Sequence, residues 1–311
     1  MRSILIGAVE STRVALEEMQ RAGLPPVLLA TFDAAIGPQR HADYVDLAGQ
    51  CGPETEIAYL DNINRPAFLD RVRTIAPDVI FVIGWSQLVG EELRGLTRRH
   101  VVGFHPTPLP ILRGRAPIAW TILSGMTRSG TSLFLIDEGT DTGPILDQHF
   151  FDLSPRETVA SLIDRVGDSL RTILRRTLPR LADGSLQAVP QSDEGASYGA
   201  RRTAEDGLID WSLPAEAVDR LVRGQGRPYA GAFTYSRRHK VIVWEATPFD
   251  GNPAYFAAEG QICFYEGGRP VVLCGGGTFL RIDAYEVLGR GPPFRFSGQT
   301  RFRDAATEID A

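Results

Sequence analysis

The sequence of 311 residues has few cysteines and no long apolar run. Cys51, Cys263 and Cys274 lie far apart, and no two of them form a CxxC pair. Such spacing gives neither a disulfide scaffold nor a zinc site, and it is typical of a cytoplasmic protein. No stretch approaches the roughly 18 apolar residues of a membrane span, and the apolar run at 3–7 is too short for a signal peptide. We therefore expect a soluble, cytoplasmic protein without a metal.

Positive charge is also scarce relative to negative charge. Lys and Arg number 33 against 38 Asp and Glu, which gives a net charge of −5. This balance provides no general attraction for a polyanion, and the second half of the chain has no Lys-rich stripe, so nucleic acid is not favoured as a partner. The length predicts two domains, and an apolar content of 43% can fill both cores.

The first half of the chain alternates short apolar runs with amphipathic stretches. Val- and Ile-rich runs bounded by Gly or Pro predict buried strands at 3–7, 26–31, 79–84, 101–105 and 131–136. Strands alternating with helices predict a mostly parallel, doubly wound sheet.

A long helix should follow this sheet. Ser154 can cap it, Pro155 suits the first helical position, and Glu157 completes a capping box. Apolar residues then recur with helical period as far as Leu178. We place the first domain at 1–182 and a polar linker at 183–207.

The remaining residues, 208–311, predict a small domain made mostly of strands. A short helix is expected around 214–222. Alternating runs predict strands at 232–235, 241–244, 260–264, 270–273 and 278–282. Short strands at this spacing are typical of a small antiparallel barrel.

The strongest candidate site is a histidine and a carboxylate at the ends of successive apolar runs. His105 ends the run at 101–105 within the segment GFHPTPLP, and Asp141 follows 36 residues later within DEGTDTG. Doubly wound sheets gather their chemistry at strand ends. A lone histidine before proline is more often structural, but here Asp141 could orient the imidazole and accept a proton. The pattern therefore predicts an active site.

These motifs carry a family resemblance. The segment HPTPLPILRGRAPIAW, together with DEGTDTGPIL, resembles the signature of the formyltransferases that use 10-formyltetrahydrofolate, and the likeness continues through 198–212 and 227–234. It implies a Rossmann-like catalytic domain, an OB-like C-terminal barrel, folate held beside the carboxyl edge of the sheet, and formyl transfer to an amine.

The resemblance also implies roles for individual residues. His105 would handle the oxyanion and a proton, and Asp141 would act as the orienting base. The folate pocket would be formed by two segments that include Ile83, Trp85, Gln87, Leu88, Glu138, Gly139 and Thr140. Thr107, Arg113 and Arg115 are candidates for binding the acceptor. The two arginines could bind a phosphate of the acceptor, or they could only stabilise their own loop. The sequence favours neither interpretation over the other.

Gly103 departs from the family pattern, in which most members carry a catalytic asparagine two residues before the histidine. Glycine cannot donate a side-chain hydrogen bond, and losing such a donor typically costs about 2.7–4 kcal/mol of transition-state stabilisation. Ser86, Gln87 or an ordered water could replace it. The Gly-x-His-Pro form also occurs in the branch associated with amino sugars, which the segments at 43–47, 61–64, 84–87 and 103–106 resemble.

Several acceptors remain open. We favour a nucleotide-linked amino sugar, with the amine of hydroxyornithine and methionyl-tRNA as alternatives. An alternative from another functional class is a formyltetrahydrofolate hydrolase or a formyltetrahydrofolate-binding protein. In that case Gly103 would indicate that formyl transfer to an amine has been lost. A homodimer is left open.

Overall fold

The computed structural model describes residues 1–237, 239–251, 254–289, 296–298 and 300–304. The chain forms two compact units, which we describe separately. The first unit comprises Met1–Pro117, Thr127–Leu153 and Leu162–Ala200. The second comprises Ile118–Met126, Ser154–Ser161 and the described residues from Arg201 onward.

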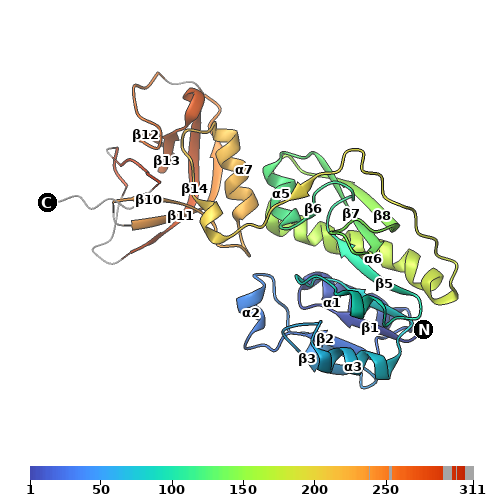
Figure 1. Ribbon diagram of the computed structural model, residues 1–311. Helices are drawn as coiled ribbons and strands as arrows, with labels where there is room; N and C mark the ends of the chain where they lie inside the picture. The colour runs from blue at the N-terminus through green and yellow to red at the C-terminus, as the bar shows by residue number, and fades with distance from the viewer. Residues whose placement is uncertain (238, 252–253, 290–295, 299, 305–311) are drawn as a thin grey trace. The chain divides into compact units, whose positions relative to one another are not determined.

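The first unit is built on a seven-stranded sheet with the order β3-β2-β1-β4-β5-β7-β8. The strands from β3 to β5 are parallel. The chain adds β2 and β3 on one side of β1 and then β4 and β5 on the other, so the order reverses between β1 and β4 (Figure 1). The strands are β1 (Ser3–Ile6), β2 (Leu28–Thr31), β3 (Glu56–Tyr59), β4 (Val79–Val82), β5 (His100–His105), β7 (Arg128–Leu135) and β8 (Ile145–Asp152).

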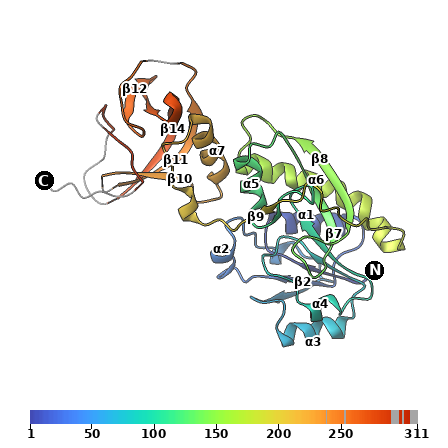
Figure 2. The ribbon, with the colours of Figure 1, turned by 45° about the horizontal axis from the view of Figure 1, so that its top comes forward.

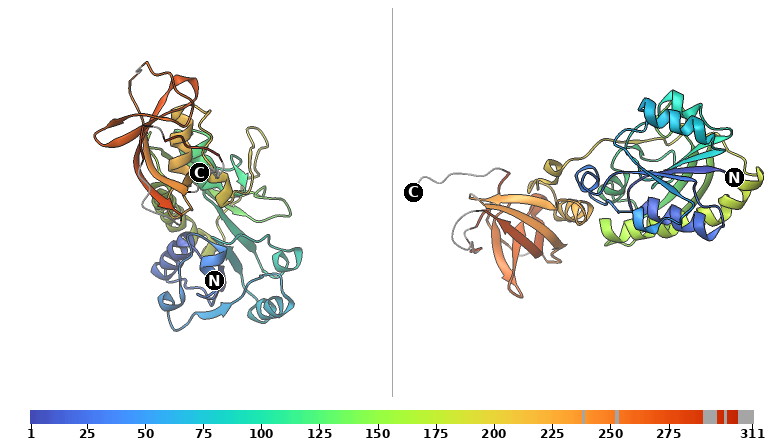
Figure 3. Two further views of the ribbon diagram at one scale, coloured as in Figure 1. Left: turned by 90° about the vertical axis from the view of Figure 1, so that its left-hand side faces the viewer. Right: turned by 90° about the horizontal axis from the view of Figure 1, so that it is seen from below.

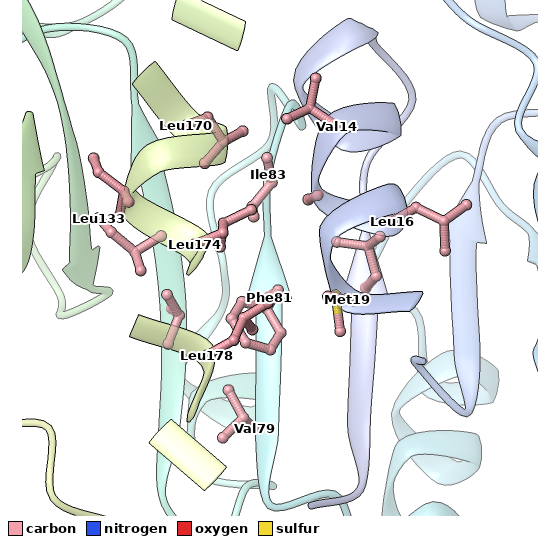
Figure 4. Packing of buried hydrophobic residues seen from close by; sticks show 14 of the residues in the cluster. Val14, Leu16, Met19, Val79, Phe81, Ile83, Leu133, Leu170, Leu174 and Leu178 are labelled. Atoms are coloured by element: carbon pink, nitrogen blue, oxygen red, sulfur yellow. The ribbon is translucent and has the colours of Figure 1, made fainter. Parts of the chain in front are cut away.

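Helices cover both faces of this sheet (Figure 3). Successive side chains of β4 point to opposite faces, so Val79 and Phe81 pack in one core and Ile80 in the other. Figure 4 shows the first of these cores, where α1 and α6 supply the covering side chains. The helices are α1 (Glu10–Arg21), α2 (Gly37–Arg40), α3 (Pro66–Ile75), α4 (Glu91–Arg94) and α6 (Val159–Asp183).

The predicted parallel strand at 131–136 is antiparallel in the structure. It forms β7, which pairs antiparallel with both β5 and β8. Two strands, β3 and β8, were not predicted, because both lie at the edges of the sheet and their partly exposed sequences lack a continuous apolar run. The expectation of a mostly parallel sheet is confirmed, but with an antiparallel edge.

The long helix begins four residues later than predicted. The Ser154 amide does donate to Glu157 Oε2 at 2.8 Å, but this bond closes a turn that precedes α6. The helix starts at Val159, and reciprocal bonds join Thr158 to Ser161 at its first turn. Two capping motifs therefore follow one another, and only the second begins the helix.

The segment after α6 runs back along the first unit. Val189 forms a bridge with Ile145. Further on, β9 (Tyr198–Gly199) pairs with β6 (Arg113–Gly114) in a small parallel sheet. The stretch that we expected to link the domains thus makes backbone pairs close to the segment that follows His105.

The second unit contains a five-stranded antiparallel sheet, as the sequence predicts, and the strand order in the structure is β10-β11-β14-β13-β12. Its two edges are joined by one segment, because Arg303 bridges Tyr235 and Arg301 bridges Gln261. This closure produces the expected barrel, and α7 contributes apolar residues to its core. Figure 2 shows this helix beside the barrel strands. Its elements are α5 (Pro117–Leu123), α7 (Ala215–Gln225), β10 (Ala232–Ser236), β11 (His239–Pro248), β12 (Ile262–Glu266), β13 (Arg269–Leu273) and β14 (Phe279–Leu288).

Among the described helices, none has both the length and the apolar character needed to cross a membrane.

Candidate active site

His105 ends β5 and is only 5% exposed. Its Nε2 lies 2.7 Å from the carbonyl oxygen of Leu112. A carbonyl oxygen can only accept a hydrogen bond, so Nε2 must carry the hydrogen in every protonation state that keeps this bond. The tautomer is therefore fixed, and Nδ1 is the ring atom that gains or loses a proton.

Asp141 faces this Nδ1. Its Oδ2 is 3.5 Å from His105 Nδ1 and also accepts a hydrogen bond from the Gly114 amide at 2.8 Å. Because β7 is antiparallel to β5, the last residue of β7 lies beside Val102 rather than beside His105. The β7–β8 connection must then return toward His105, so Asp141 does not reach it as the end of a neighbouring parallel strand.

Burial and the neighbouring polar groups shift the pKa of His105 in opposite directions. Burial lowers the pKa of the His105 imidazole below its ordinary value, although the Asp141 carboxylate and the Leu112 carbonyl favour the protonated form. The ring is consequently neutral at neutral pH. The separation of 3.5 Å is longer than a hydrogen bond, which fits a lone pair on Nδ1 opposite a carboxylate. A proton arriving at Nδ1 would be shared with Asp141.

The backbone around the pair is strained. Leu112, Ala116 and Asp141 have φ angles of 55°, 51° and 57°, and they are three of the five non-glycine residues with positive φ in the described part of the chain. Each such residue typically costs about 1–3 kcal/mol and persists only where its surroundings hold it. Strain of this kind gathers at functional sites, so it supports the same location for the chemistry.

Gly103 leaves no room for the family's asparagine. A Cβ added there would lie 2.8 Å from the Phe134 ring and 2.9 Å from Ile136 Cγ1. Apolar side chains therefore fill the place of the missing donor. Gln87 does not replace it in this structure, since its amide contacts the backbone of Asp61 and Ile63 and the indole of Trp85.

The three residues expected to bind the acceptor differ in exposure and in hydrogen-bond partners. Arg113 is 1% exposed, and its guanidinium donates to Gln191 Oε1, Asp193 Oδ1 and the Tyr198 hydroxyl, which is the buttressing role. Thr107 is fully buried, and its hydroxyl donates to the Ile111 carbonyl at 2.6 Å, so this placement does not suit a substrate contact.

Arg115, by contrast, is exposed, and its Nη1 donates to the Ser86 carbonyl at 2.8 Å. His41 is partly buried. Its Nε2 is buried and finds no hydrogen-bond partner among the described residues. Burial lowers the pKa of His41, the nearby Asp43 carboxylate opposes this shift, and the charge of Arg115 adds to it.

The residues expected at the folate divide into buried and accessible ones. Ile83 is fully buried in the core, and only its backbone could take part. Trp85 is partly buried and stacks on Phe32, with ring centroids 4.2 Å apart and planes at 18°. The accessible positions are Leu88, which is 73% exposed, and the loop residues Glu138, Gly139 and Thr140.

Asp137 shapes that loop. Its carboxylate accepts bonds from the Gly139 amide at 3.0 Å and the Thr142 hydroxyl at 2.8 Å. At the end of the loop, a Cβ on Gly143 would lie 1.7 Å from the Leu135 carbonyl oxygen, so only glycine fits there.

Sequence reasoning missed two contributors to the site. The Leu112 carbonyl belongs to the backbone, and no sequence pattern reports where a carbonyl points. Gln191 lies in a stretch without apolar period, yet its amide donates to the carbonyls of Asp141 and Gly143. No signal in the sequence separates it from other linker glutamines.

The fold and the site define an α/β protein of two compact units, with a buried histidine opposite a carboxylate. The family model described as formyl transferase matches residues 53–178, and the model of the formyl transferase C-terminal domain matches residues 201–290. The chain belongs to the formyl transferase family and is a formyltransferase that depends on 10-formyltetrahydrofolate.

Solved structures share the fold at low identity. An N-formyltransferase from Helicobacter canadensis, in complex with folinic acid and dTDP-3-aminofucose, is 14% identical with a TM-score of 0.66, covering 91% of this chain and 98% of its own. Methionyl-tRNA formyltransferase from Clostridium thermocellum is 20% identical with a TM-score of 0.59, covering 81% and 95%. HypX from Aquifex aeolicus, in complex with tetrahydrofolic acid, is 16% identical with a TM-score of 0.62, covering 92% of this chain and 44% of its own.

The packing around Gly103 predicts that an asparagine at this position destabilises the protein. Gly103→Asn should lower the free energy of unfolding by about 1–3 kcal/mol, because the side chain must displace Phe134 and Ile136. Urea denaturation would measure this. Gly49→Asn, at a position with open space around it, serves as the control and should be nearly neutral. A stable Gly103→Asn variant with a raised kcat would contradict the packing argument.

Proposed function

We propose that the acceptor of this formyltransferase is the primary amine of a nucleotide-linked amino sugar. The observation that carries the transfer chemistry is the buried His105, whose Nδ1 faces the Asp141 carboxylate at 3.5 Å. The acceptor class is supported by the shared fold with the Helicobacter canadensis N-formyltransferase, which binds folinic acid and dTDP-3-aminofucose. The net charge of −5 argues against a tRNA acceptor.

The role of the pair is to carry one proton. When bound, 10-formyltetrahydrofolate supplies a formyl group on its N10 nitrogen. As the acceptor amine attacks the formyl carbon, His105 Nδ1 takes the proton that the amine loses, and Asp141 stabilises the imidazolium. The Nδ1–H can then donate to the oxygen that gains negative charge and return the proton to N10 as the C–N10 bond breaks. The products are the formamide and tetrahydrofolate.

The residues present fit a folate beside this pair. The exposed loop of Glu138, Gly139 and Thr140 offers backbone groups, and its turn is held by Asp137. Leu88 offers exposed apolar surface, and Trp85 lies in the same segment. Ile83 and Gln87 would support this wall from behind, since one is buried and the other is bound to neighbouring backbone.

Arg115 is the residue that we assign to the acceptor's phosphate. It is exposed and anchored by one bond to the Ser86 carbonyl, which leaves other N–H groups of the guanidinium to donate. His41 Nε2, which is buried and has no hydrogen-bond partner among the described residues, is a second candidate donor. We do not assign this role to Arg113, because its guanidinium donates to Gln191, Asp193 and Tyr198.

An acceptor panel tests the proposal. Release of tetrahydrofolate from 10-formyltetrahydrofolate would be followed with nucleotide-linked 3-amino and 4-amino sugars, hydroxyornithine, methionyl-tRNA or no acceptor. We expect release that depends on an amino sugar, with the formamide identified by mass spectrometry. Release only with methionyl-tRNA or hydroxyornithine would replace the acceptor class. Release without any acceptor would indicate a hydrolase.

The lowered pKa of His105 predicts the pH dependence. Because neutral Nδ1 is the base, activity should fall only as the pH drops through this pKa, so the acid limb of kcat/KM should lie below the ordinary value of 6.5. Asp141→Asn removes a charge that favours protonation, so it should move the limb to still lower pH and reduce the rate. His100→Gln, at the other end of β5, should change neither. An acid limb above 6.5 would contradict this assignment.

Arg115→Ala should raise the KM for the acceptor about ten- to a hundredfold, because a charged hydrogen bond is worth about 1.5–3 kcal/mol. The KM for the folate should stay unchanged, and steady-state kinetics with each substrate varied would show both values. Arg180→Ala, which removes another exposed arginine, is the control. An equal rise in both KM values would remove Arg115 from the acceptor site.

A further inference from the structure

The segment Gln191–Gly199, here called the strap, bonds to the backbone of Asp141 and to the backbone of Leu112, whose carbonyl orients His105. We propose that Gln191 is a positioning residue, which holds the backbone of the Asp141 loop against Arg113 and so keeps the carboxylate opposite His105 Nδ1. The inference rests on the proposed proton transfer only for its effect on rate, since the geometry that it describes can be measured without turnover.

The amide of Gln191 uses all of its hydrogen-bonding groups at this junction. Its Nε2 donates to the Asp141 carbonyl at 2.9 Å and to the Gly143 carbonyl at 2.6 Å. Its Oε1 accepts from Arg113 Nη2 at 2.9 Å and from Nε at 3.2 Å. One side chain thereby joins the β7–β8 loop to the segment that follows β5.

The strap also bonds to the backbone segment that orients His105. The Leu112 amide donates to Ser197 Oγ at 2.9 Å, and the Arg113 amide donates to the Ser197 carbonyl at 2.8 Å. The Leu112 carbonyl is the acceptor that orients His105. One segment therefore positions both reacting side chains. Ser197 bonds to the backbone that orients His105, and Gln191 bonds to the loop that carries Asp141.

Asp141 needs such a restraint because of its own conformation. It is a non-glycine residue at φ 57°, and the preceding loop residues Glu138, Gly139 and Thr140 are exposed. The two loop carbonyls that Gln191 binds flank the point where Gly143 approaches the Leu135 carbonyl. Without these bonds, the loop could relax and carry the carboxylate away from Nδ1.

Gln191→Glu separates positioning from packing. Glutamate keeps the shape and the acceptor for Arg113, but it replaces the two N–H donors with an oxygen that faces two carbonyls. A side chain that only packs, or only accepts hydrogen bonds from Arg113, would tolerate this change. Positioning instead predicts a fall in kcat of about ten- to a hundredfold with little change in either KM, as small misplacements of catalytic groups produce. Glu194→Gln, on the exposed part of the strap, is the matched control and should retain wild-type kinetics.

A second variant gives a readout that does not need turnover. Gln191→Met removes the hydrogen bonds without adding charge. The pKa of His105 would be followed by NMR titration, with its signal identified by its loss in His105→Gln. Because the Asp141 carboxylate favours protonated His105, its displacement should lower this pKa further. Glu194→Gln should leave the pKa where it is, and thermal unfolding of all variants would show that they are folded.

The outcomes separate this inference from the proposed function. An unchanged pKa in Gln191→Met, together with wild-type kcat in Gln191→Glu, would overturn the positioning role even if amino sugars are formylated. A lowered pKa in a protein that formylates no amino sugar would support the positioning role while the proposed acceptor fails.

Discussion

The buried guanidinium of Arg113 is the constraint on which the arrangement of the site depends. A charged group that is 1% exposed would cost several kcal/mol if it were left without partners. Its side-chain partners are Gln191, Asp193 and Tyr198, which all lie in the strap. Satisfying this charge therefore requires the chain to fold back after α6. Once it has done so, β9 pairs with β6, and Ser197 reaches the Leu112 amide. The carbonyl that orients His105 is positioned as part of the same set of contacts.

Two side chains and the backbone around them then account for the candidate chemistry. The Leu112 carbonyl restricts His105 to one tautomer, and the Gly114 amide holds the Asp141 carboxylate. Phe134 and Ile136 pack against Gly103, so a third polar side chain is not accommodated at that position. Burial strengthens the electrostatic interaction within the pair and at the same time lowers the pKa of the imidazole. A neutral base next to a carboxylate is the result.

Low identity with a shared fold has a physical explanation here. The three solved structures named above are 14–20% identical to this chain, with TM-scores of 0.59–0.66. A core tolerates extensive apolar substitution as long as volume and pattern are kept. In β4, the alternation of Val79, Ile80 and Phe81 between two cores meets that requirement. In the second unit, the pairing of Arg301 and Arg303 with the two sheet edges closes the barrel through backbone bonds, which depend little on side-chain identity.

The sequence by itself determined the elements whose signal is local. Continuous apolar runs predicted β1, β2, β4 and β5, alternating runs predicted the barrel strands, and the motifs around His105 and Asp141 predicted the pair. Tertiary structure alone decided the direction of β7, the start of α6, the burial of Thr107 and Arg113, and the recruitment of Gln191. These features depend on contacts between residues far apart in the chain and on backbone groups that every residue carries. Local composition and periodicity therefore predict neither the long-range contacts nor the positions of the backbone groups.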